Sequence, residues 1–194
     1  MKVLVVFDHP RRHSFCGAVL DEFVAGLAEA GHEVEIADLH AEGFDPRMPE
    51  TDEPDWNDPD KRYSAAVLQE QARIARNEVL AFVFPVWWWS LPAMLKGWID
   101  RVWNNGWAYG ARKLPHRRAL LIGTAAGNDE DYRRWGYDKA MLTQLVTGIM
   151  NYCGIPEAEL RLLYDVTGAP GVERRQAQLQ EMRALGRSLA LQPA

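Results

Sequence analysis

The residues of this sequence that could do chemistry gather in short loops that directly follow apolar segments. The first loop holds His9 and Ser14-Phe15-Cys16, and Ser14 stands where a helix N-cap belongs. N–H groups at a helix start, with the positive end of the helix dipole behind them, bind anions. The coincidence of His9 with this helix start predicts a phosphate site. Taken singly, Ser14 is more simply a plain N-cap, and His9 is as readily a surface histidine.

The second loop, Pro85-Val86-Trp87-Trp88-Trp89, carries three consecutive indole rings. Three adjacent rings cannot all point into one core, so at least one of them lines a groove or a partner surface. A hydrophobic cluster or a dimer seam is the alternative interpretation, because aromatic residues also gather at interfaces. The position of the loop after a strand favours a flat ligand that stacks on aromatic rings.

The third loop, Thr124-Ala125-Ala126, consists of small residues and again follows an apolar segment. Neither G-x-G-x-x-G nor G-x-x-x-x-G-K-[ST] occurs in the sequence, so a dinucleotide fingerprint and a P-loop are both unsupported. The cradle for a phosphate would then be the start of the first helix itself.

The elements that position these loops alternate between strands and helices. The hydrophobic patterns predict strands at 2–7, 33–38, 79–84, 119–123 and 160–166, and helices at 15–31, 64–77, 91–105, 136–153 and 172–190. This alternation predicts one α/β domain over residues 1–194, with a doubly wound, five-stranded parallel sheet of order 2-1-3-4-5 and helices on both faces. In that order the three loops share one crevice. The long connection 40–62 contains Phe44, Met48 and Trp56, which favour an ordered excursion over a flexible linker.

Composition narrows the classes of protein. A formal net charge of −5 argues against a nucleic-acid surface. No apolar run approaches the ~20 residues needed to span a bilayer, and the N-terminus is a predicted strand without a signal cleavage site, so we expect a cytoplasmic protein. Cys16 and Cys153 are far apart, with no C-x-x-C and no adjacent histidine cluster. We therefore expect neither a disulfide framework nor a metal site.

Three motifs together carry a resemblance to a known family. They are His9 with Ser14-Phe15, then Gly43-Phe44-Asp45-Pro46, and above all Phe84-Pro85-x-x-Trp88-Trp89-x-x-Pro92-Ala93-x-Leu95-Lys96-Gly97-Trp98, continued by Gly106-Trp107-Ala108-Tyr109-Gly110. In this order they resemble the NAD(P)H:quinone oxidoreductases, a family of flavodoxin-like flavoproteins. The family includes small bacterial members named as potassium-efflux ancillary proteins and general stress proteins.

The resemblance implies a flavodoxin-like fold, a bound flavin (FMN in preference to FAD, with FAD still possible) and NAD(P)H as co-substrate. It implies that two electrons pass to a quinone or a similar small electrophile by ping-pong hydride transfer. The residues that it assigns to the flavin phosphate are His9, Ser14, Phe15 and Cys16. Those assigned to the edge of the isoalloxazine ring, and to the loop beside it, are Pro85, Val86, Trp87, Trp88 and Trp89, with Thr124, Ala125 and Ala126.

The resemblance also implies a substrate pocket formed by Trp88, Tyr132, Tyr137 and, from a second subunit, Tyr109. We expect Tyr132 to be catalytic by donating a hydrogen bond to the acceptor, although the alignment leaves Tyr137 open for that place. Backbone N–H groups of residues 86–89 are expected to stabilise the reduced flavin. Two departures from the family stand out: Cys16 where it often has Asn, and Ala125-Ala126 where many members have Gly-Gly.

Two other functions compete with an enzyme. A flavin-containing regulatory subunit could act by peripheral contact with a membrane ion-efflux transporter, and steady-state NAD(P)H oxidation would distinguish it from an enzyme. A one-electron carrier like flavodoxin is disfavoured by the bulky tryptophan pocket and the modest acidity. A homodimer is expected, because the tryptophan-rich segment 91–105 offers more apolar surface than one sheet needs to cover.

Overall fold

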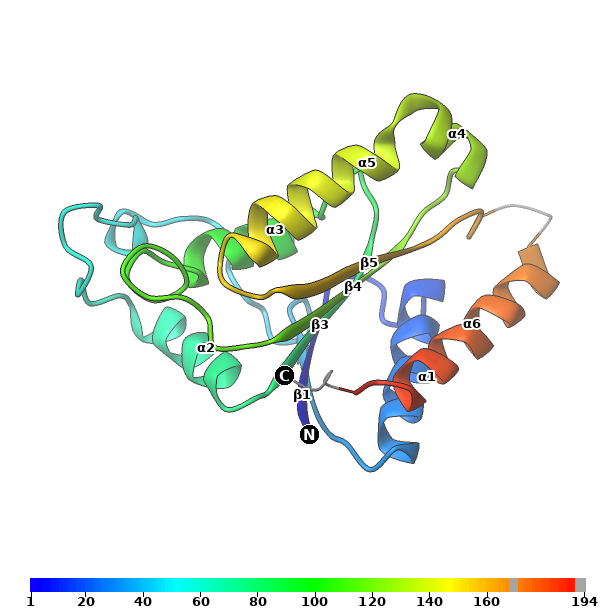
Figure 1. Cartoon of the computed structure of the whole chain (residues 1–194), viewed down its shortest axis with the longest axis horizontal. Helices are drawn as coiled ribbons and strands as arrows, with labels where there is room; N and C mark the ends of the chain where they lie inside the picture. Colours follow the sequence, from blue (N-terminus) through cyan, green and yellow to red (C-terminus); the bar gives the residue numbers. More distant parts are fainter. Residues whose placement is uncertain (168–170, 191–194) are drawn as a thin grey trace.

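The computed structural model describes residues 1–167 and 171–190, and within them one sheet is covered by helices on both faces (Figure 1). The strands are β1 (Lys2–Phe7), β2 (Glu33–Asp38), β3 (Val79–Pro85), β4 (Arg118–Thr124) and β5 (Glu157–Leu163). Their order is β2-β1-β3-β4-β5, and every neighbouring pair is parallel. The predicted sheet and its strand order are confirmed.

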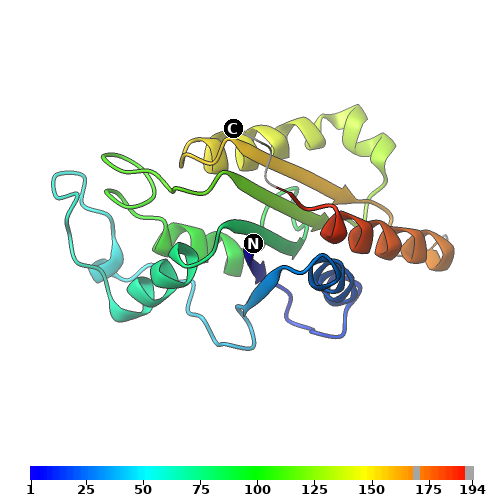
Figure 2. The same ribbon diagram turned by 60° about the horizontal axis from the view of Figure 1, so that its bottom comes forward.

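Two layers of helix enclose this sheet (Figure 2). The helical segments are α1 (Phe15–Glu29), η1 (Glu50–Asp52), α2 (Ala65–Ala75), α3 (Ala93–Val102), α4 (Asp129–Trp135), α5 (Tyr137–Met141), the π-helical η2 (Leu142–Asn151) and α6 (Gly171–Arg187). On one face α1 packs against α6, and on the other α2, α3 and η2 form the cover. None of these helices, in the part of the chain that the structure describes, is both long and apolar enough to cross a bilayer.

The central strand β3 shows why its sequence is apolar without alternation. All of its residues are buried. Val79, Ala81 and Val83 belong to the cluster beneath α1 and α6, whereas Phe82 and Phe84 belong to the cluster beneath α2, α3 and η2. Because successive side chains point to opposite faces, a strand covered on both sides must be hydrophobic at every position.

The predicted position of the last strand was wrong. We expected it at 160–166, but β5 spans Glu157–Leu163, and its register pairs Arg118 with Glu157. The strand lies at the edge of the sheet, where Glu159 and Arg161 engage other charged groups on the surface. Apolar residues therefore do not mark its beginning, and the hydrogen-bonded ladder with β4 fixes its limits.

The helices between β4 and β5 also differ from the prediction. A single helix was expected at 136–153, but α5 passes into the π-helical η2, and the short helix α4 precedes them at residues expected to form a loop. The signals for α4 are present locally. The Asn128 side chain accepts a hydrogen bond from the Asp131 N–H at 2.7 Å, and Gly136 ends the helix with φ 73°. The helix expected at 91–105 is shorter, spanning Ala93–Val102.

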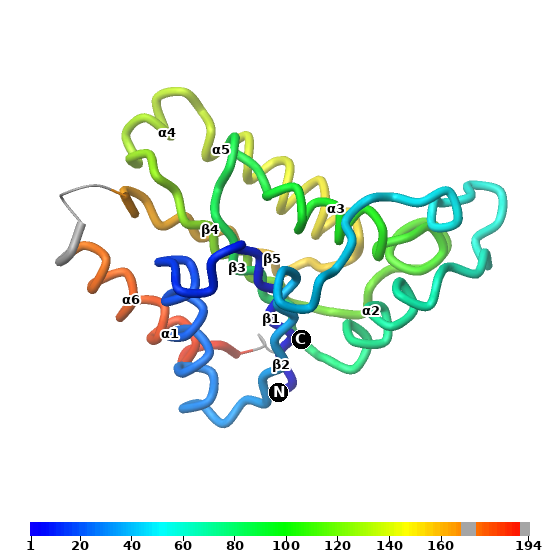
Figure 3. The backbone as a smooth tube through the Cα atoms, turned by 180° about the vertical axis from the view of Figure 1, so that it is seen from behind, coloured from blue at the N-terminus to red at the C-terminus, as the bar shows by residue number. Residues whose placement is uncertain are grey.

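The connection 40–62 packs on the domain as an ordered excursion, which confirms the prediction (Figure 3). Arg101 of α3 forms a buried ion pair with Asp52, with 2.7 Å between Nη2 and Oδ2. Asn105 donates a hydrogen bond from Nδ2 to the backbone oxygen of Asp55 at 2.9 Å. These contacts fasten the excursion to α3 and to the segment that follows it.

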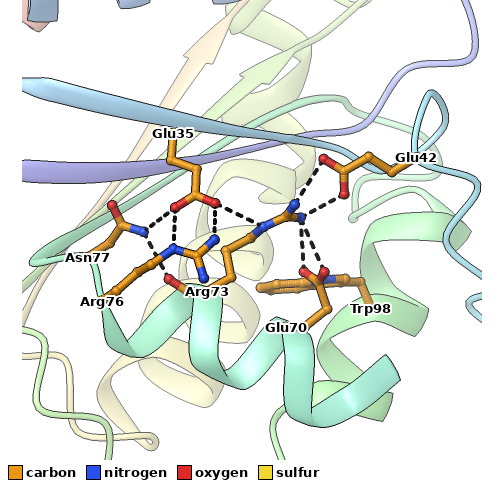
Figure 4. Close-up of polar contacts among 7 residues, drawn as sticks. All are labelled: Glu35, Glu42, Glu70, Arg73, Arg76, Asn77 and Trp98. Atoms are coloured by element: carbon orange, nitrogen blue, oxygen red, sulfur yellow. Dashed lines mark hydrogen bonds and ion pairs between the residues drawn. The ribbon is translucent and has the colours of Figure 1, made fainter. Parts of the chain in front are cut away.

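A second polar network secures α2 against the same face (Figure 4). Arg73 lies among three carboxylates, with 2.7 Å from Nη1 to Glu42, 3.2 Å from Nη1 to Glu70 and 3.2 Å from Nε to Glu35. Glu70 in turn accepts a hydrogen bond from the indole Nε1 of the buried Trp98 at 2.9 Å. The network thereby joins α2 to β2, to the connection and to α3, and it satisfies the polar atom of the largest core side chain.

Candidate functional site

A cleft of about 390 Å³ lies beyond the carboxyl ends of β1, β3, β4 and β5. This is the edge of an open parallel sheet at which ligands bind, and β1 and β3 are the neighbours at its topological switch point. The lining residues are His9, Pro10, Arg11, Ser14, Phe15, Cys16, Pro85, Val86, Trp87, Thr124, Ala126, Val166 and Thr167.

Most of the predicted cofactor residues meet in this cleft. They are His9, Ser14, Phe15, Cys16, Pro85, Val86, Trp87, Thr124 and Ala126. Three loops that are distant in sequence thus form one cavity, as the sheet order predicts. The individual contacts of these residues with a cofactor remain predictions.

Other predicted site residues lie elsewhere. Ala125 is fully buried, and its N–H donates to the Leu163 oxygen at 2.8 Å, so it lies behind the cleft wall. Trp88 points away from the protein with 87 % of its surface exposed. Tyr109 lines a separate cavity of about 430 Å³ between α3 and η2, and within its own chain it does not reach the cleft.

Four lining residues were not predicted: Pro10, Arg11, Val166 and Thr167. Arg11 was not singled out from the sequence, although its place two residues after His9 was a usable signal. Val166 and Thr167 were missed because the last strand was predicted to end three residues late. Once β5 ends at Leu163, the residues after it fall at the same edge of the sheet as the other loops.

The start of α1 offers several hydrogen-bond donors to this cleft. The Ser14 Oγ accepts from the Gly17 N–H at 3.1 Å, which leaves the Ser14 O–H free to donate. Within residues 1–167 and 171–190, the N–H groups of Phe15 and Cys16 have no hydrogen-bond acceptor. A Cβ on Gly17 would lie 1.9 Å from the Arg12 carbonyl oxygen, so only glycine permits this close approach of loop and helix. These donors, backed by the helix dipole, suit a phosphate.

His9 is held in one tautomer. Its Nδ1 accepts a hydrogen bond from the Arg11 N–H at 3.0 Å, so in the neutral ring the proton is on Nε2. Burial and the neighbouring Arg11 lower the pKa of His9 below its usual value. The imidazole is therefore neutral at physiological pH and can donate one hydrogen bond from Nε2.

Cys16 lines the cleft as a neutral thiol. Burial raises its pKa to about 12, and a hydrogen bond with Thr124 offsets only part of that effect. A thiol with so high a pKa is a poor nucleophile at neutral pH. Its part in the cleft is to fill space beside the helix start.

Trp87 to Ser90 form a tight turn with unusual backbone geometry. Trp88 and Trp89 both have φ 52°, a left-handed conformation that costs a bulky residue about 1–2 kcal/mol. The Trp87 N–H donates to the Ser90 oxygen at 3.3 Å, and the Val86 N–H donates to the Thr124 oxygen at 2.8 Å. The expectation that backbone N–H groups of residues 86–89 stabilise a reduced flavin is therefore wrong for Val86 and Trp87. Of these four N–H groups, those of Trp88 and Trp89 have no acceptor among the described residues.

Aromatic rings connect this turn to the segment after β4. Trp89 stacks on Tyr137 with 4.1 Å between ring centroids, Tyr137 meets the edge of Tyr132 at 5.8 Å, and Tyr132 meets Tyr164 at 5.0 Å. Tyr132 is buried, and burial followed by the nearby Tyr164 raises its pKa. Neither Tyr132 nor Tyr137 is among the residues that line the cleft, and the Tyr132 hydroxyl, like that of an ordinary tyrosine, keeps its proton at physiological pH. Tyr137 instead contributes its ring to packing against the turn.

Comparison with known proteins places this architecture in a family. The sequence profile of the family described as having a flavodoxin-like fold matches residues 1–185. The chain belongs to this flavodoxin-like family. Its predicted fold class is thereby confirmed on independent grounds.

Similar members of the family are named as oxidoreductases. The uncharacterized NAD(P)H oxidoreductase YcaK of Escherichia coli K12 is 35% identical over 93% of this chain and 92% of its own. The ribosyldihydronicotinamide dehydrogenase [quinone] of Rattus norvegicus is 30% identical, and the match covers 79% of this chain and 77% of that protein. The solved structure of an NAD(P)H:quinone oxidoreductase from Methanothermobacter marburgensis superposes with a TM-score of 0.93 at 31% identity, covering 100% of this chain and 98% of that one.

These relatives confirm the predicted relationship of this flavodoxin-like protein to NAD(P)H:quinone oxidoreductases. None of the three is named as a transporter subunit, so the regulatory alternative gains no support from them.

Proposed function

We propose that this chain is a flavin-dependent NAD(P)H oxidoreductase that delivers two electrons to a quinone or a similar small acceptor. The observation that carries the proposal is the single cleft where the start of α1, the tryptophan turn and the end of β4 meet. Two unused N–H groups and a hydroxyl at one end suit a phosphate, and Trp87 supplies an aromatic wall. A phosphorylated molecule with a planar ring fits this donor set and shape.

A flavin, when bound, supplies the hydride chemistry itself. The chain has to hold and orient the group and to provide hydrogen-bond donors. Ser14, Phe15 and Cys16 would bind the phosphate through the Ser14 O–H and two backbone N–H groups, with His9 donating from Nε2. Arg11 adds positive charge at the same end of the cleft. The N–H groups of Trp88 and Trp89 are left to donate to a ring, and they are preorganised by the turn.

FMN is the cofactor that we propose. The cleft volume of about 390 Å³ lies near the lower end of the usual range for ligand sites, about 300–1,000 Å³, which favours a mononucleotide over a dinucleotide. Mass spectrometry of the group released from the purified protein tests this choice directly. Release of FAD would reject it without affecting the assignment of a flavin.

Tyr132 is the proposed donor to the acceptor molecule, because the family resemblance gives it that place and its ring meets that of Tyr137, which stacks on Trp89 of the tryptophan turn. Tyr132→Phe should lower turnover with a quinone while leaving flavin binding intact. Tyr137→Phe is a matched control, because the ring that stacks on Trp89 is retained. Equal quinone turnover in wild-type protein and Tyr132→Phe would remove this role.

A homodimer is part of the proposal, because Tyr109 can enter a substrate pocket only from a second copy of the chain. Tyr109 lines the cavity between α3 and η2, where the centroid of its ring lies 5.7 Å from that of Trp56 and 6.0 Å from that of Tyr152. Sedimentation equilibrium at micromolar concentration measures the association. A monomer under these conditions would exclude a shared pocket.

The decisive experiment is reconstitution followed by steady-state kinetics. Purified protein should carry a yellow chromophore, or take one up, and should oxidise NAD(P)H with menadione as acceptor. Double-reciprocal plots at several acceptor concentrations should be parallel, because both substrates use one cleft in turn. Protein that neither carries nor takes up flavin would refute the proposed function.

A further inference from the structure

A buried carboxylate connects the two loops that carry most of the cleft. Asp8 directly follows β1 and is completely buried. Its Oδ2 accepts a hydrogen bond from the Leu95 N–H at 2.8 Å, and its Oδ1 lies 2.8 Å from His40 Nε2. The loop 9–14 starts at the next residue, and Leu95 belongs to the first turn of α3, which follows the tryptophan turn.

The helix α3 needs this carboxylate because it has no cap of its own. Its N-cap is Pro92, which makes no side-chain hydrogen bond. The Leu95 N–H is one of the donors at a helix start that has no acceptor within the helix, and a negative charge there is also favoured by the helix dipole. Asp8 therefore takes the place of a local capping residue from 87 positions away in the sequence. The start of α3, and with it the end of the tryptophan turn, therefore depends on Asp8 at the end of β1.

His40 is the partner that makes this arrangement tolerable. Burial raises the pKa of Asp8, whereas the hydrogen bond from Leu95 and the proximity of His40 oppose that effect. A buried carboxylate without partners is costly, and His40, which follows β2, satisfies its second oxygen. The backbone on either side is also fixed, since the Asp8 N–H donates to the Val83 oxygen and the Leu39 N–H donates to the Phe7 oxygen.

We infer that Asp8 and His40 are positioning residues, which hold the loop after β1 and the tryptophan turn at a fixed separation so that both reach one cofactor. This inference rests on the proposed function for the identity of the cofactor. The juxtaposition of the two loops through the carboxylate does not depend on it.

The test compares Asp8→Ala, His40→Ala and His40→Gln with the wild-type chain. Affinity for FMN is measured on apoprotein by quenching of flavin fluorescence, and hydrogen–deuterium exchange is followed at Leu95 and in the turn. Asp8→Ala should weaken FMN binding at least tenfold and accelerate exchange in both places. His40→Ala should act in the same direction, and His40→Gln should restore much of the loss because its amide N–H can donate to Asp8.

Ser64→Ala provides the matched control. The Ser64 Oγ also accepts a hydrogen bond from an N–H at a helix start, that of Val67 in α2 at 3.4 Å, but α2 contributes no residue to the cleft. This variant should lower the melting temperature of the apoprotein and leave the FMN dissociation constant unchanged. A purely structural role for Asp8 would give the same pattern as Ser64→Ala.

FMN affinity of Asp8→Ala within twofold of wild type would overturn the inference. If that variant fails to fold, the pair His40→Ala and His40→Gln decides: equal FMN affinity and equal exchange in both would overturn it. If the wild-type chain binds no flavin, the proposed function fails. Exchange at Leu95 and in the turn then decides the positioning role alone, which stands if Asp8→Ala accelerates it and falls if it does not.

Discussion

Replacing Arg101 with methionine should destabilise this protein more than any surface substitution, because it leaves a buried charge without its partner. The guanidinium of Arg101 lies 2.7 Å from Asp52, with side-chain exposures of 8% and 0%. Asp52 also accepts hydrogen bonds at 2.9 Å from both the N–H and the Oγ of Ser64, and these survive in the variant. Methionine retains most of the apolar stem of arginine, so the change chiefly removes charge and hydrogen bonds.

The expected magnitude follows from the burial of the pair. Removing one partner of a buried ion pair costs about 3–5 kcal/mol, and the two remaining hydrogen bonds to Asp52 place Arg101→Met near the lower end, at about 3 kcal/mol. For a chain of this length, each kcal/mol shifts the melting temperature by about 2–4 °C, so we expect a decrease of about 6–12 °C. A domain has about 5–15 kcal/mol in total, and the variant should therefore remain folded at room temperature.

The loss of stability in Arg101→Met should depend on pH. Burial alone would raise the pKa of Asp52, but the hydrogen bonds from Arg101 and Ser64 outweigh it and hold the pKa below the usual 3.8. A carboxyl whose pKa is lowered on folding contributes stability above pH 3.8 that is lost as the pH falls through the folded-state value. Without Arg101, we expect the effect of burial to outweigh the remaining hydrogen bonds from Ser64, so that the pKa of Asp52 rises. The difference between variant and wild type should thus be largest at neutral pH and shrink below about pH 4.

Urea unfolding of the apoprotein, repeated at pH 7 and near pH 3.5, measures this difference without a contribution from ligand binding. The double variant Asp52→Asn/Arg101→Met should recover part of the loss, because no isolated charge remains. Arg47→Ala is the control for an exposed pair: Arg47 bonds to Asp45 at 2.8 Å with 87% of its side chain exposed, and no change is expected. A loss below about 1 kcal/mol, or one that is equal at both pH values, would refute the reasoning.

Three further predictions concern the cleft. Ser14→Ala should weaken FMN binding and lower stability by about 1 kcal/mol, since the hydroxyl caps α1 and faces the cleft, and unchanged FMN affinity would contradict its role as a donor. Because Cys16 is buried and its pKa is raised to about 12, it should react with Ellman's reagent at pH 8 in the folded apoprotein much more slowly than a free thiol, and rapid labelling there would contradict the burial. Trp88→Asn should raise the free energy of unfolding by about 1 kcal/mol, since asparagine tolerates positive φ, while quinone turnover falls. Trp135→Asn, an exposed tryptophan within α4, is its control, and an equal gain there would contradict relief of backbone strain.

The sequence by itself determined the elements whose signals are local. The limits of β1 and β2 and the course of α1 follow from hydrophobic period, capping by Ser14 and the termination near Gly31. The location of the cleft also followed, because parallel strands end at one edge of a sheet and the loops after β1, β3 and β4 must meet there. These inferences need only short-range patterns and one rule of topology.

Tertiary structure decided which groups remain free to act. Whether an N–H at Val86 or Ala125 faces a ligand depends on whether Thr124 or Leu163, on a neighbouring strand, has already accepted its hydrogen bond. The extent of β5 and the entry of Thr167 into the cleft were likewise fixed by the ladder with β4. Each of these outcomes depends on pairing between residues far apart in the chain, because a hydrogen-bonding group satisfied within the fold has nothing left to offer a ligand, and local sequence carries no record of its partner.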